Sequence, residues 1–226
     1  MDYFVLVLLP LGLSFFIGWR FKKKAKEYSQ IGLANGMTGA EIAKHMLNDN
    51  GIFDVSITST QGTLSDHYNP VSKTVNLSHD VYYGRSVMSA AVAAHECGHA
   101  VQHARAYAPL QFRSSIIPFV SIASNWVQWI LLAGVLAINF TQSTLILQIG
   151  VLLFAVTTFF SIVTLPVEYD ASRRALAWLN EKNYLSHDEA PVAKSALQWA
   201  GSTYLIAALA SIGTLLYYMN MLNRRN

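Results

Sequence analysis

The sequence is poor in charge and almost free of cysteine. Only 13% of its 226 residues are charged and 53% are hydrophobic, whereas about a quarter of the residues are charged in an average soluble domain. Residues 114–167 contain no charged side chain at all. The single cysteine, Cys97, excludes an internal disulfide and a zinc site built from cysteines. These absences are typical of an integral membrane protein.

The chain does contain apolar segments long enough to span a membrane. A helix needs roughly 20 such residues to cross a bilayer. Four segments come close to that length, and they cover residues 3–18 (extended to 21 by Trp19 and Phe21), 116–140, 145–166 and 204–222. We expect a mainly α integral membrane protein with a single membrane-embedded domain over residues 1–226. Its parts are an anchor at 3–21, a transmembrane hairpin formed by the second and third segments, and a last transmembrane helix.

The distribution of positive charge predicts an orientation. Fourteen of the sixteen Lys and Arg residues lie in segments 19–113 and 168–201, and none lies in the connection 141–144. Lys and Arg accumulate on the cytoplasmic side of membrane proteins. The polar parts at 22–115 and 168–200 are therefore expected in the cytoplasm.

Charges near the two ends of the sequence bear on this topology. Asp2 precedes the first apolar segment and residues 22–24 are all lysine, which is the reverse of the charge order of a signal peptide. We expect a retained anchor with its N-terminus outside. Arg224 and Arg225 would lie outside if residues 204–222 cross fully, so the sequence leaves open whether this helix crosses.

A five-residue motif carries the chemistry. Residues 95–99 read H-E-C-G-H within an alanine-rich stretch that favours a helix. His95 and His99 are four residues apart, so on a helix both can face one zinc ion, and Glu96 can act as general base on a zinc-bound water. The alternatives are a chance match and a buried helix whose histidines are only hydrogen-bonded. Small residues of the motif helix, among them Gly98, would let another helix approach closely.

A catalytic zinc site needs a third protein ligand, and His103 is excluded from that role. On a straight helix His103 lies about 12 Å along the axis from His95. A bent helix could bring in a third histidine only with glycine at position 102 and histidine at position 105. Gln102 and Arg105 stand there.

Glu168 is the better candidate for the third ligand. It is the first acidic residue after Glu96, and it follows the predicted hairpin, which returns the chain to its original side. Asp170 would face about 200° away on a helix, so both cannot be ligands. Ala171 and Ala175 share the face of Glu168 and are small enough for close packing on the motif helix. Alternatively, Glu168 only marks the membrane boundary, and the ligand is Asp170, His67 or His187.

The remaining polar part predicts a small α+β region. Thr38 and Glu41 form a capping box for a helix that Gly51 ends. Residues 55–58 and 74–78 alternate in polarity and are expected to form a short β-hairpin. The edge of strand 74–78 could pair with an extended substrate over the metal, although an ordinary hairpin explains it equally well.

Several polar residues have weaker functional interpretations. Asp66, His67 and Tyr68 are more typical of a turn than of a site. Ser186 is expected to cap the last helix. His187 or Tyr169 could donate a hydrogen bond to an oxyanion.

Several stretches together resemble a known family. They are the anchor and residues 64–70, 74–78, 91–100 (A-V-A-A-H-E-C-G-H-A) with 102–103 (Q-H), and 166–172 (P-V-E-Y-D-A-S). Over most of its length the chain is similar to the YugP-like neutral zinc metallopeptidases of bacterial membranes, and more distantly to HtpX-type gluzincins. The resemblance implies proteolytic activity. In the wider group the third ligand belongs to a pattern like E-[FY]-x-A-D, whose Asp supports a zinc histidine. Ser172 stands in its place here, so Ser172 or Asp170 would take that role.

We therefore predict a membrane-bound zinc metalloendopeptidase with a gluzincin-like site. His95, His99 and Glu168 are expected to bind Zn²⁺, and Glu96 to act as general base on a zinc-activated water. The expected partners are the bilayer of the cell membrane and membrane or juxtamembrane polypeptides, not nucleic acid, with the active site facing the cytoplasm. The oligomeric state stays open. The alternatives are a non-catalytic zinc-containing scaffold or chaperone, and a hydrolase of lipid-linked esters.

Overall fold

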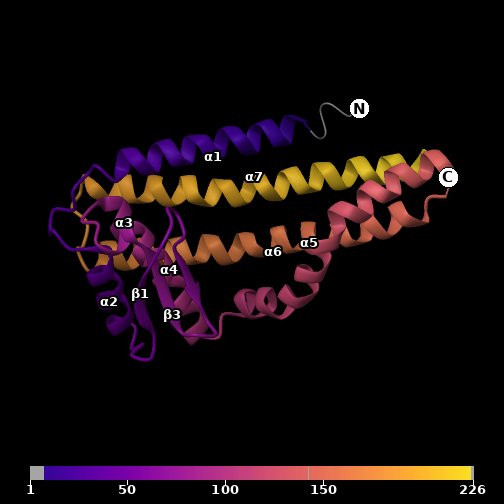
Figure 1. Cartoon of the computed structure of the whole chain (residues 1–226). Coiled ribbons are helices and arrows are strands. Elements are labelled where there is room, and N and C mark those ends of the chain that lie inside the picture. The colour runs from indigo at the N-terminus through magenta and orange to yellow at the C-terminus, as the bar shows by residue number, and fades with distance from the viewer. Residues whose placement is uncertain (1–7, 142, 225–226) are drawn as a thin grey trace. The chain divides into compact units, whose positions relative to one another are not determined.

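The chain is mainly helical, as the sequence predicts, with one small sheet. The computed structural model describes residues 8–141 and 143–224. Its elements follow one another along the chain (Figure 1) as α1 (Leu9–Tyr28), α2 (Gly39–Asp49), β1 (Ser56–Thr60), β2 (His67–Asn69), β3 (Thr74–Ser78), α3 (His79–Tyr82), α4 (Val87–Ala104), α5 (Ala108–Thr141), α6 (Leu145–Glu181) and α7 (Glu189–Asn223).

The chain divides into two compact units. Unit 1 consists of Met1–Gly18, Phe112–Leu165 and Thr203–Asn226, and unit 2 of Trp19–Gln111 and Pro166–Ser202. Unit 1 contains most of the apolar sequence, and unit 2 contains the sheet, the H-E-C-G-H motif and Glu168.

The sheet of unit 2 differs from the predicted hairpin. Its strand order is β1-β3-β2. β1 runs parallel to β3, with Ser56 opposite Thr74, whereas β2 is the antiparallel partner of β3, with His67 opposite Asn76. The prediction that strands 55–58 and 74–78 pair as a hairpin was therefore wrong, because the connection between them contains β2. β3 is the central strand, so its edges are occupied and cannot receive a substrate.

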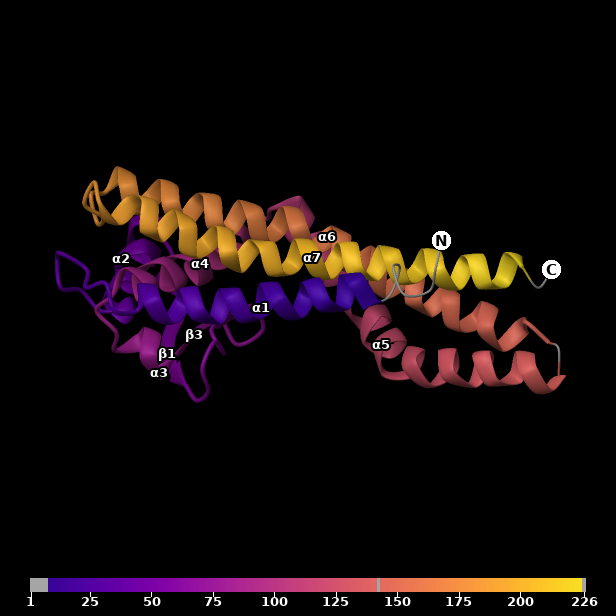
Figure 2. The ribbon, with the colours of Figure 1, turned by 90° about the horizontal axis from the view of Figure 1, so that it is seen from above.

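Helices cover one face of this sheet. Val75 and Leu77 of β3 are fully buried in a core that also contains residues of α2, α4 and α6. α4 contacts α2, α3, β2 and β3. Figure 1 shows β3 near α4, and Figure 2 shows β1 next to β3 from above. The motif helix is thus held on several sides by unit 2.

The predicted capping box of α2 is confirmed. The hydroxyl of Thr38 accepts a hydrogen bond from the backbone N–H of Glu41, and the carboxylate of Glu41 accepts from the N–H of Thr38. Gly51, at φ +71°, follows the end of the helix, in the left-handed region that glycine adopts without strain.

Unit 1 contains a tight contact between α5 and α6. A Cβ on Gly134 would meet the Cα of Leu147 at 2.6 Å, and one on Gly150 would meet the side chain of Leu131 at 2.9 Å. The surrounding cluster is apolar and includes Val127, Leu131 and Val151. Glycine therefore sets the spacing of these two helices.

Three helices in the described part of the chain are long and apolar enough to cross a membrane. They are residues Ala108–Ile138 of α5, all of α6, and all of α7. α7 covers the predicted last span and the polar segment before it without a break. The anchor predicted at 3–21 is described only from residue 8, because residues 3–7 lie outside the described residues, and it stays a prediction.

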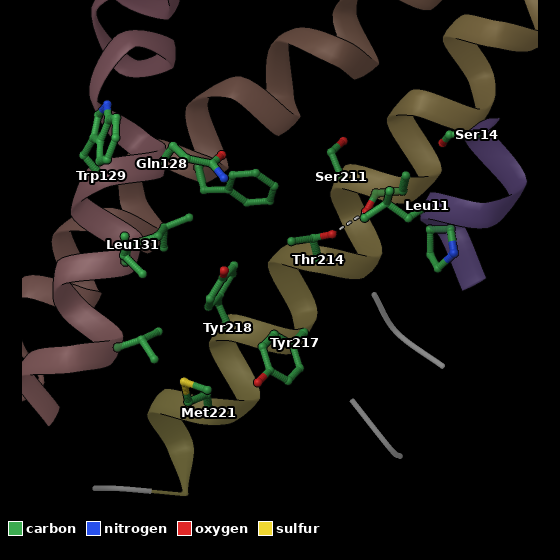
Figure 3. A pocket seen from close by; sticks show the side chains of 15 residues that line it. Leu11, Ser14, Gln128, Trp129, Leu131, Ser211, Thr214, Tyr217, Tyr218 and Met221 are labelled. Atoms are coloured by element: carbon green, nitrogen blue, oxygen red, sulfur yellow. Dashed lines mark hydrogen bonds between the residues drawn. The ribbon is translucent and has the colours of Figure 1, made fainter. Parts of the chain in front are cut away.

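A cavity of about 910 Å³ lies within unit 1, lined by residues of α1, α5, α6 and α7 (Figure 3). Its lining is largely apolar, with Leu11 and Trp129 among the labelled side chains. The hydroxyls of Ser211 and Thr214 donate to carbonyls of their own helix, at 2.9 Å each. These hydroxyls are thus satisfied within α7.

Candidate metal centre

α4 presents the two motif histidines together. The side chain of Ser86 caps the helix by accepting from the N–H of Ser89 at 3.1 Å. His95 and His99 lie one turn apart with ring centroids 4.8 Å from each other. Their side chains are 13% and 12% exposed. The two imidazoles therefore line one nearly buried spot, open enough for a small ligand to enter.

α6 brings Glu168 to this spot because α4 has a glycine at the helix contact. A Cβ on Gly98 would lie 2.7 Å from the carbonyl oxygen of Ala171 and 3.1 Å from its Cα. Ala171 and Ala175 are completely buried. The close approach expected from these small residues is confirmed, and it places the carboxylate one turn before Ala171 beside the histidines.

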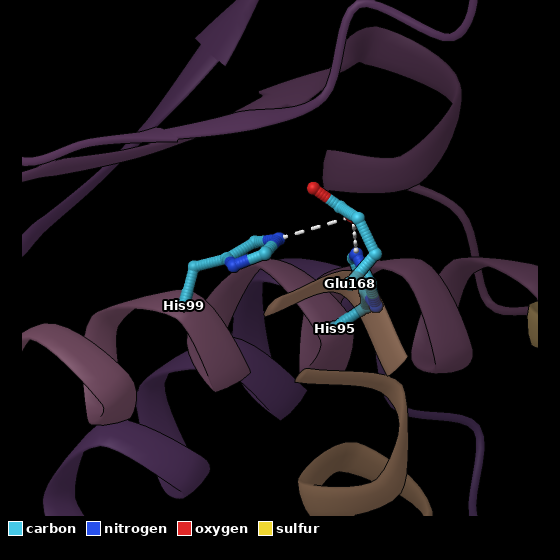
Figure 4. Close-up of side chains that lie close together, drawn as sticks. All are labelled: His95, His99 and Glu168. Atoms are coloured by element: carbon cyan, nitrogen blue, oxygen red, sulfur yellow. Dashed lines mark ion pairs between the residues drawn. The ribbon is translucent and has the colours of Figure 1, made fainter. Parts of the chain in front are cut away.

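The three side chains converge through their ligand atoms. Oε2 of Glu168 lies 3.3 Å from Nε2 of His95 and 3.5 Å from Nε2 of His99 (Figure 4). All three ligand atoms lie within 4.8 Å of one another. Tetrahedral zinc with bonds of about 2.0–2.1 Å sets neighbouring ligand atoms roughly 3.3 Å apart. Two imidazole nitrogens and one carboxylate oxygen at this spacing fit a zinc ion.

The outer nitrogen of His95 has a partner on α6. Its Nδ1 lies 3.0 Å from Oγ of Ser172. Histidines that bind metal usually direct their second nitrogen to such a group, which fixes the ring orientation. Ser172 thus occupies the supporting position for His95, in agreement with the first of the two expectations for Ser172 and Asp170.

Gln102 supports His99 and also ties α4 to α6. This fully buried amide donates from Nε2 to the carbonyl oxygen of Val167 at 2.8 Å and to Asp170 at 2.9 Å. Its Oε1 therefore faces Nδ1 of His99, 3.0 Å away, and must accept there. His99 accordingly carries its proton on Nδ1 and keeps the lone pair of Nε2 for the position near Glu168.

Asp170 completes a chain of contacts behind His99. Arg173 binds one of its oxygens, and Arg174 binds the other at 2.6 Å. Arg174 also stacks over the ring of Tyr107. Although burial opposes ionisation, Arg174 and Gln102 hold the pKa of Asp170 below its ordinary value. Asp170 therefore acts on His99 through Gln102, as an anion held by two arginines.

The charges around the histidines attract a cation. Burial lowers the pKa of His99, but Glu168 and the charge of Glu96 more than offset it, so this pKa is raised. Burial likewise opposes ionisation of Glu168, yet His95 and His99 hold its pKa well below the ordinary value. Glu96 itself is buried. Two carboxylates next to two imidazoles make a site suited to a divalent ion.

The other polar candidates lie elsewhere. Nδ1 of His103 contacts the hydroxyl of Tyr68 at 3.0 Å, and Nδ1 of His67 lies 2.9 Å from the backbone oxygen of Ser65. The side chain of His187 is fully exposed beside Asp188. Within the described residues, the group that could hold a metal contains none of these histidines.

Asp66 and Tyr68 have structural roles. Asp66 accepts from the backbone N–H of Ser78 at 2.7 Å and from its hydroxyl, so it fixes the end of β3. Tyr68 belongs to β2, whereas the sequence favoured a turn at this position.

Cys97 is not positioned for chemistry. Its thiol is completely buried and lies 3.6 Å from the carbonyl oxygen of Ala43. Burial raises the pKa of this thiol, so it stays protonated at neutral pH and packs as a small apolar group.

Sequence reasoning missed the role of Gln102. In the sequence, Gln102 had meaning only as the residue at the glycine position of a bent zinc helix and as part of the family resemblance, and no role in the site was predicted for it. A signal was present, since Gln102 lies three residues after His99 and thus near its face of the helix. It is also a polar residue among small buried ones.

Comparisons with known proteins give the family of the chain. Over 227 aligned residues, which cover 100% of this chain and 99% of the relative, the sequence is 38% identical to the "Putative membrane protease YugP" of Bacillus subtilis (strain 168). No solved structure matches the chain. A family model described as "Putative neutral zinc metallopeptidase" matches residues 3–223. The chain belongs to the family that this model describes.

Proposed function

We propose that the protein is a membrane-bound zinc metalloendopeptidase with a gluzincin-type site. His95, His99 and Glu168 are its zinc ligands. The observation that carries the proposal is the convergence of their three ligand atoms within 4.8 Å, with both outer histidine nitrogens directed to Ser172 and Gln102. Zinc is also the metal in the name of the family.

Glu96 is the residue that makes this site catalytic. Zinc at this position would supply a Lewis acid that activates water and polarises the scissile carbonyl. The carboxylate of Glu96, buried next to His95 in α4, takes the proton of the attacking water and delivers it to the leaving amine. A zinc site with only a structural role would not need this carboxylate.

The substrates are proposed to be membrane or juxtamembrane polypeptides, cut on the cytoplasmic side of the cell membrane. The support is positional. In α6, Glu168 follows Leu165, where the Phe112–Leu165 segment of unit 1 ends, by three positions. The Lys and Arg residues cluster in the segments that carry the site, which favours a cytoplasmic site.

The first experiment measures zinc per purified chain in detergent, for the wild type, Glu168→Ala and Glu181→Ala. Glu181 is an exposed carboxylate at the end of the same helix and serves as the control. We expect about one zinc in the wild type and the control, and much less in Glu168→Ala with unchanged helicity. Full zinc in Glu168→Ala would show that Glu168 is not a ligand and would overturn the site.

A labelling experiment tests the orientation. Ser143→Cys lies in the connection between α5 and α6, and Asp188→Cys lies just before α7. Native Cys97 is buried and gives little background. A membrane-impermeant maleimide should label Ser143→Cys in intact cells and Asp188→Cys only after lysis. The reverse pattern would place the site outside.

A further inference from the structure

The outer edge of β1 is open. Ser56 donates its backbone N–H to the carbonyl oxygen of Lys73 at 3.0 Å. In a parallel ladder alternate residues bond to the same neighbour, so Ser56 and Thr58 face β3, whereas Ile57 and Ser59 direct their N–H and C=O groups away from it. Within the described residues, no hydrogen bond reaches these outward groups of Ile57 and Ser59.

β1 also lacks the features that protect a sheet edge. Proteins block free edges with charged side chains, proline, bulges or very short strands. The sequence of β1 is S-I-T-S-T, its five residues contain neither charge nor proline, and its register with β3 is regular. β2, the other edge strand, has only three residues. The unprotected edge is therefore that of β1.

A groove runs beside this edge. Its volume is about 440 Å³, and α2, the segment after α2, β1 and Tyr82 line it. Leu47, Ile52 and Ile57 supply apolar lining, and Phe53 is 80% exposed at its margin. Ile57 lies opposite the buried Val75. Alternate side chains of a strand added to β1 would therefore point toward the groove.

Lys44 gives the groove a charge preference. It lines the groove from α2, and within the described residues no carboxylate forms an ion pair with it. Glu41 also lines the groove, but its carboxylate already accepts from the N–H and the hydroxyl of Thr38. Within the described residues, Lys44 is therefore the charged side chain of the lining that has no hydrogen-bond or ion-pair partner.

We infer that the outer edge of β1 and the groove beside it bind an extended segment of a polypeptide substrate as a fourth strand, away from the metal centre. Such a segment has apolar side chains at alternate positions and an acidic residue near Lys44. Only a polypeptide backbone presents N–H and C=O groups at the repeat of the open edge.

The choice of a substrate as occupant rests on the proposed function. β1 and β2 flank β3, so the two outer strands are about 10 Å apart. β2 contacts the motif helix. A chain of ten or more residues can extend from the groove past the sheet, whereas a short peptide cannot. The groove would hold long substrates and leave the chemistry of short ones unchanged.

A binding experiment tests the inference without catalysis. The full chain carrying Glu96→Gln is titrated in detergent with a fluorescein-labelled decapeptide of alternating valine and threonine that ends in glutamate. Ser59→Pro is the key variant, since proline is tolerated where the N–H faces away from the ladder, and Ser59→Ala is its control. We expect Ser59→Pro to weaken binding about tenfold or more, because a backbone bond is lost and the ring obstructs pairing. Ser59→Ala should bind like the parent.

Two further probes keep the test independent of folding. The same decapeptide, N-methylated at alternate residues, should fail to bind the unaltered edge, because it cannot donate to β1. Lys44→Glu should weaken the glutamate peptide about two- to fivefold and favour a lysine-ended version. Equal binding of the N-methylated peptide, or full binding to a folded Ser59→Pro variant, overturns the inference.

Turnover and oligomeric state separate the remaining outcomes. Ser59→Pro in an otherwise unchanged chain should raise KM for unfolded casein while leaving kcat and the hydrolysis of short peptides as they are. Peptide binding without any hydrolysis would count against the proposed function and not against the groove. The wild type could instead form dimers that Ser59→Pro dissociates, and bind no peptide. That result would show that a second copy occupies the edge and would overturn the choice of a substrate.

Discussion

Each unit contains a helix contact that glycine makes possible, and the two contacts differ in chemistry. In unit 2, Gly98 lets α4 approach Ala171 of α6. In unit 1, Gly134 lets α5 approach Leu147, in another part of α6. Around Gly134 the buried side chains are apolar. Around Gly98 the close contact carries histidines, carboxylates and a buried glutamine.

The difference between the two helix contacts indicates the role of the buried polar groups in unit 2. Unit 1 shows that α6 can pack closely on a neighbour by shape alone. Unit 2 buries Gln102, Glu168 and Asp170 as well, and burying polar groups costs free energy unless each is paired. Each has partners in the described structure. These polar contacts hold the ligand atoms of His95, His99 and Glu168 close together. Close packing of apolar side chains would not position them in this way.

The largest effect on activity is expected from a substitution in unit 2, at Glu96. Glu96→Gln should reduce peptide hydrolysis about 10²- to 10⁴-fold, because the amide cannot take a proton from water. Zinc content should stay at the wild-type level, since Glu96 is not among the three converging ligands. Cleavage of a proven substrate and metal content are measured on the same sample. Wild-type turnover in the zinc-loaded variant would contradict the assignment of Glu96.

The matched glycines provide the next test. Gly98→Ala and Gly134→Ala both place a methyl group against backbone atoms of α6, at 2.7 Å and 2.6 Å respectively. Both should destabilise the protein by about 1–3 kcal/mol. Only Gly98→Ala should lower zinc content, because only that contact positions Glu168. Maleimide labelling of the buried Cys97 reports whether unit 2 has opened. Equal zinc loss in both variants would mean that the metal reports general unfolding.

A smaller effect is expected for the groups behind the histidines. Gln102→Glu keeps an acceptor for His99 but can no longer donate to Val167 and Asp170, and Ser172→Ala removes the partner of His95. Each should weaken zinc binding about 10- to 100-fold, as measured by competition with a chelating dye. Gln128→Leu, at the cavity of unit 1, is the control and should leave the affinity unchanged. Wild-type affinity in Gln102→Glu would reduce Gln102 to a packing residue.

Local patterns in the sequence predicted much of unit 2. The capping box at Thr38, the strand at 74–78 and the motif helix follow from residues close together in the chain. Gly98 and Ala171 were predicted to allow a close helix contact because small residues have this effect in any context. The three candidate ligands, which the structure brings together, could be proposed because few other residues satisfy the chemistry of a zinc site.

Some contacts between segments that are far apart in the chain were not predicted from the sequence. β2 has only three residues, and the sequence around Asp66 and His67 favours a turn. The strand forms because it pairs with β3, which local sequence does not indicate. The parallel pairing of β1 with β3 depends on which strand lies between them in sequence and space. The sequence around Gln102 does not indicate its role, because its partners Val167 and Asp170 lie in α6, far along the chain. These features depend on contacts between segments far apart in the chain.

The smallest expected effect comes from a buried hydroxyl in unit 1. In the described part of the chain, Oγ1 of Thr158 in α6 is buried without a hydrogen-bond partner. Replacing it by the similarly shaped valine removes this unsatisfied group. Thr158→Val should therefore be neutral or stabilise the protein by up to about 1 kcal/mol, as measured by thermal unfolding in detergent, with zinc content unchanged. A clear loss of stability or zinc would show that unit 1 depends on polar groups as unit 2 does, and the contrast between the two helix contacts would fail.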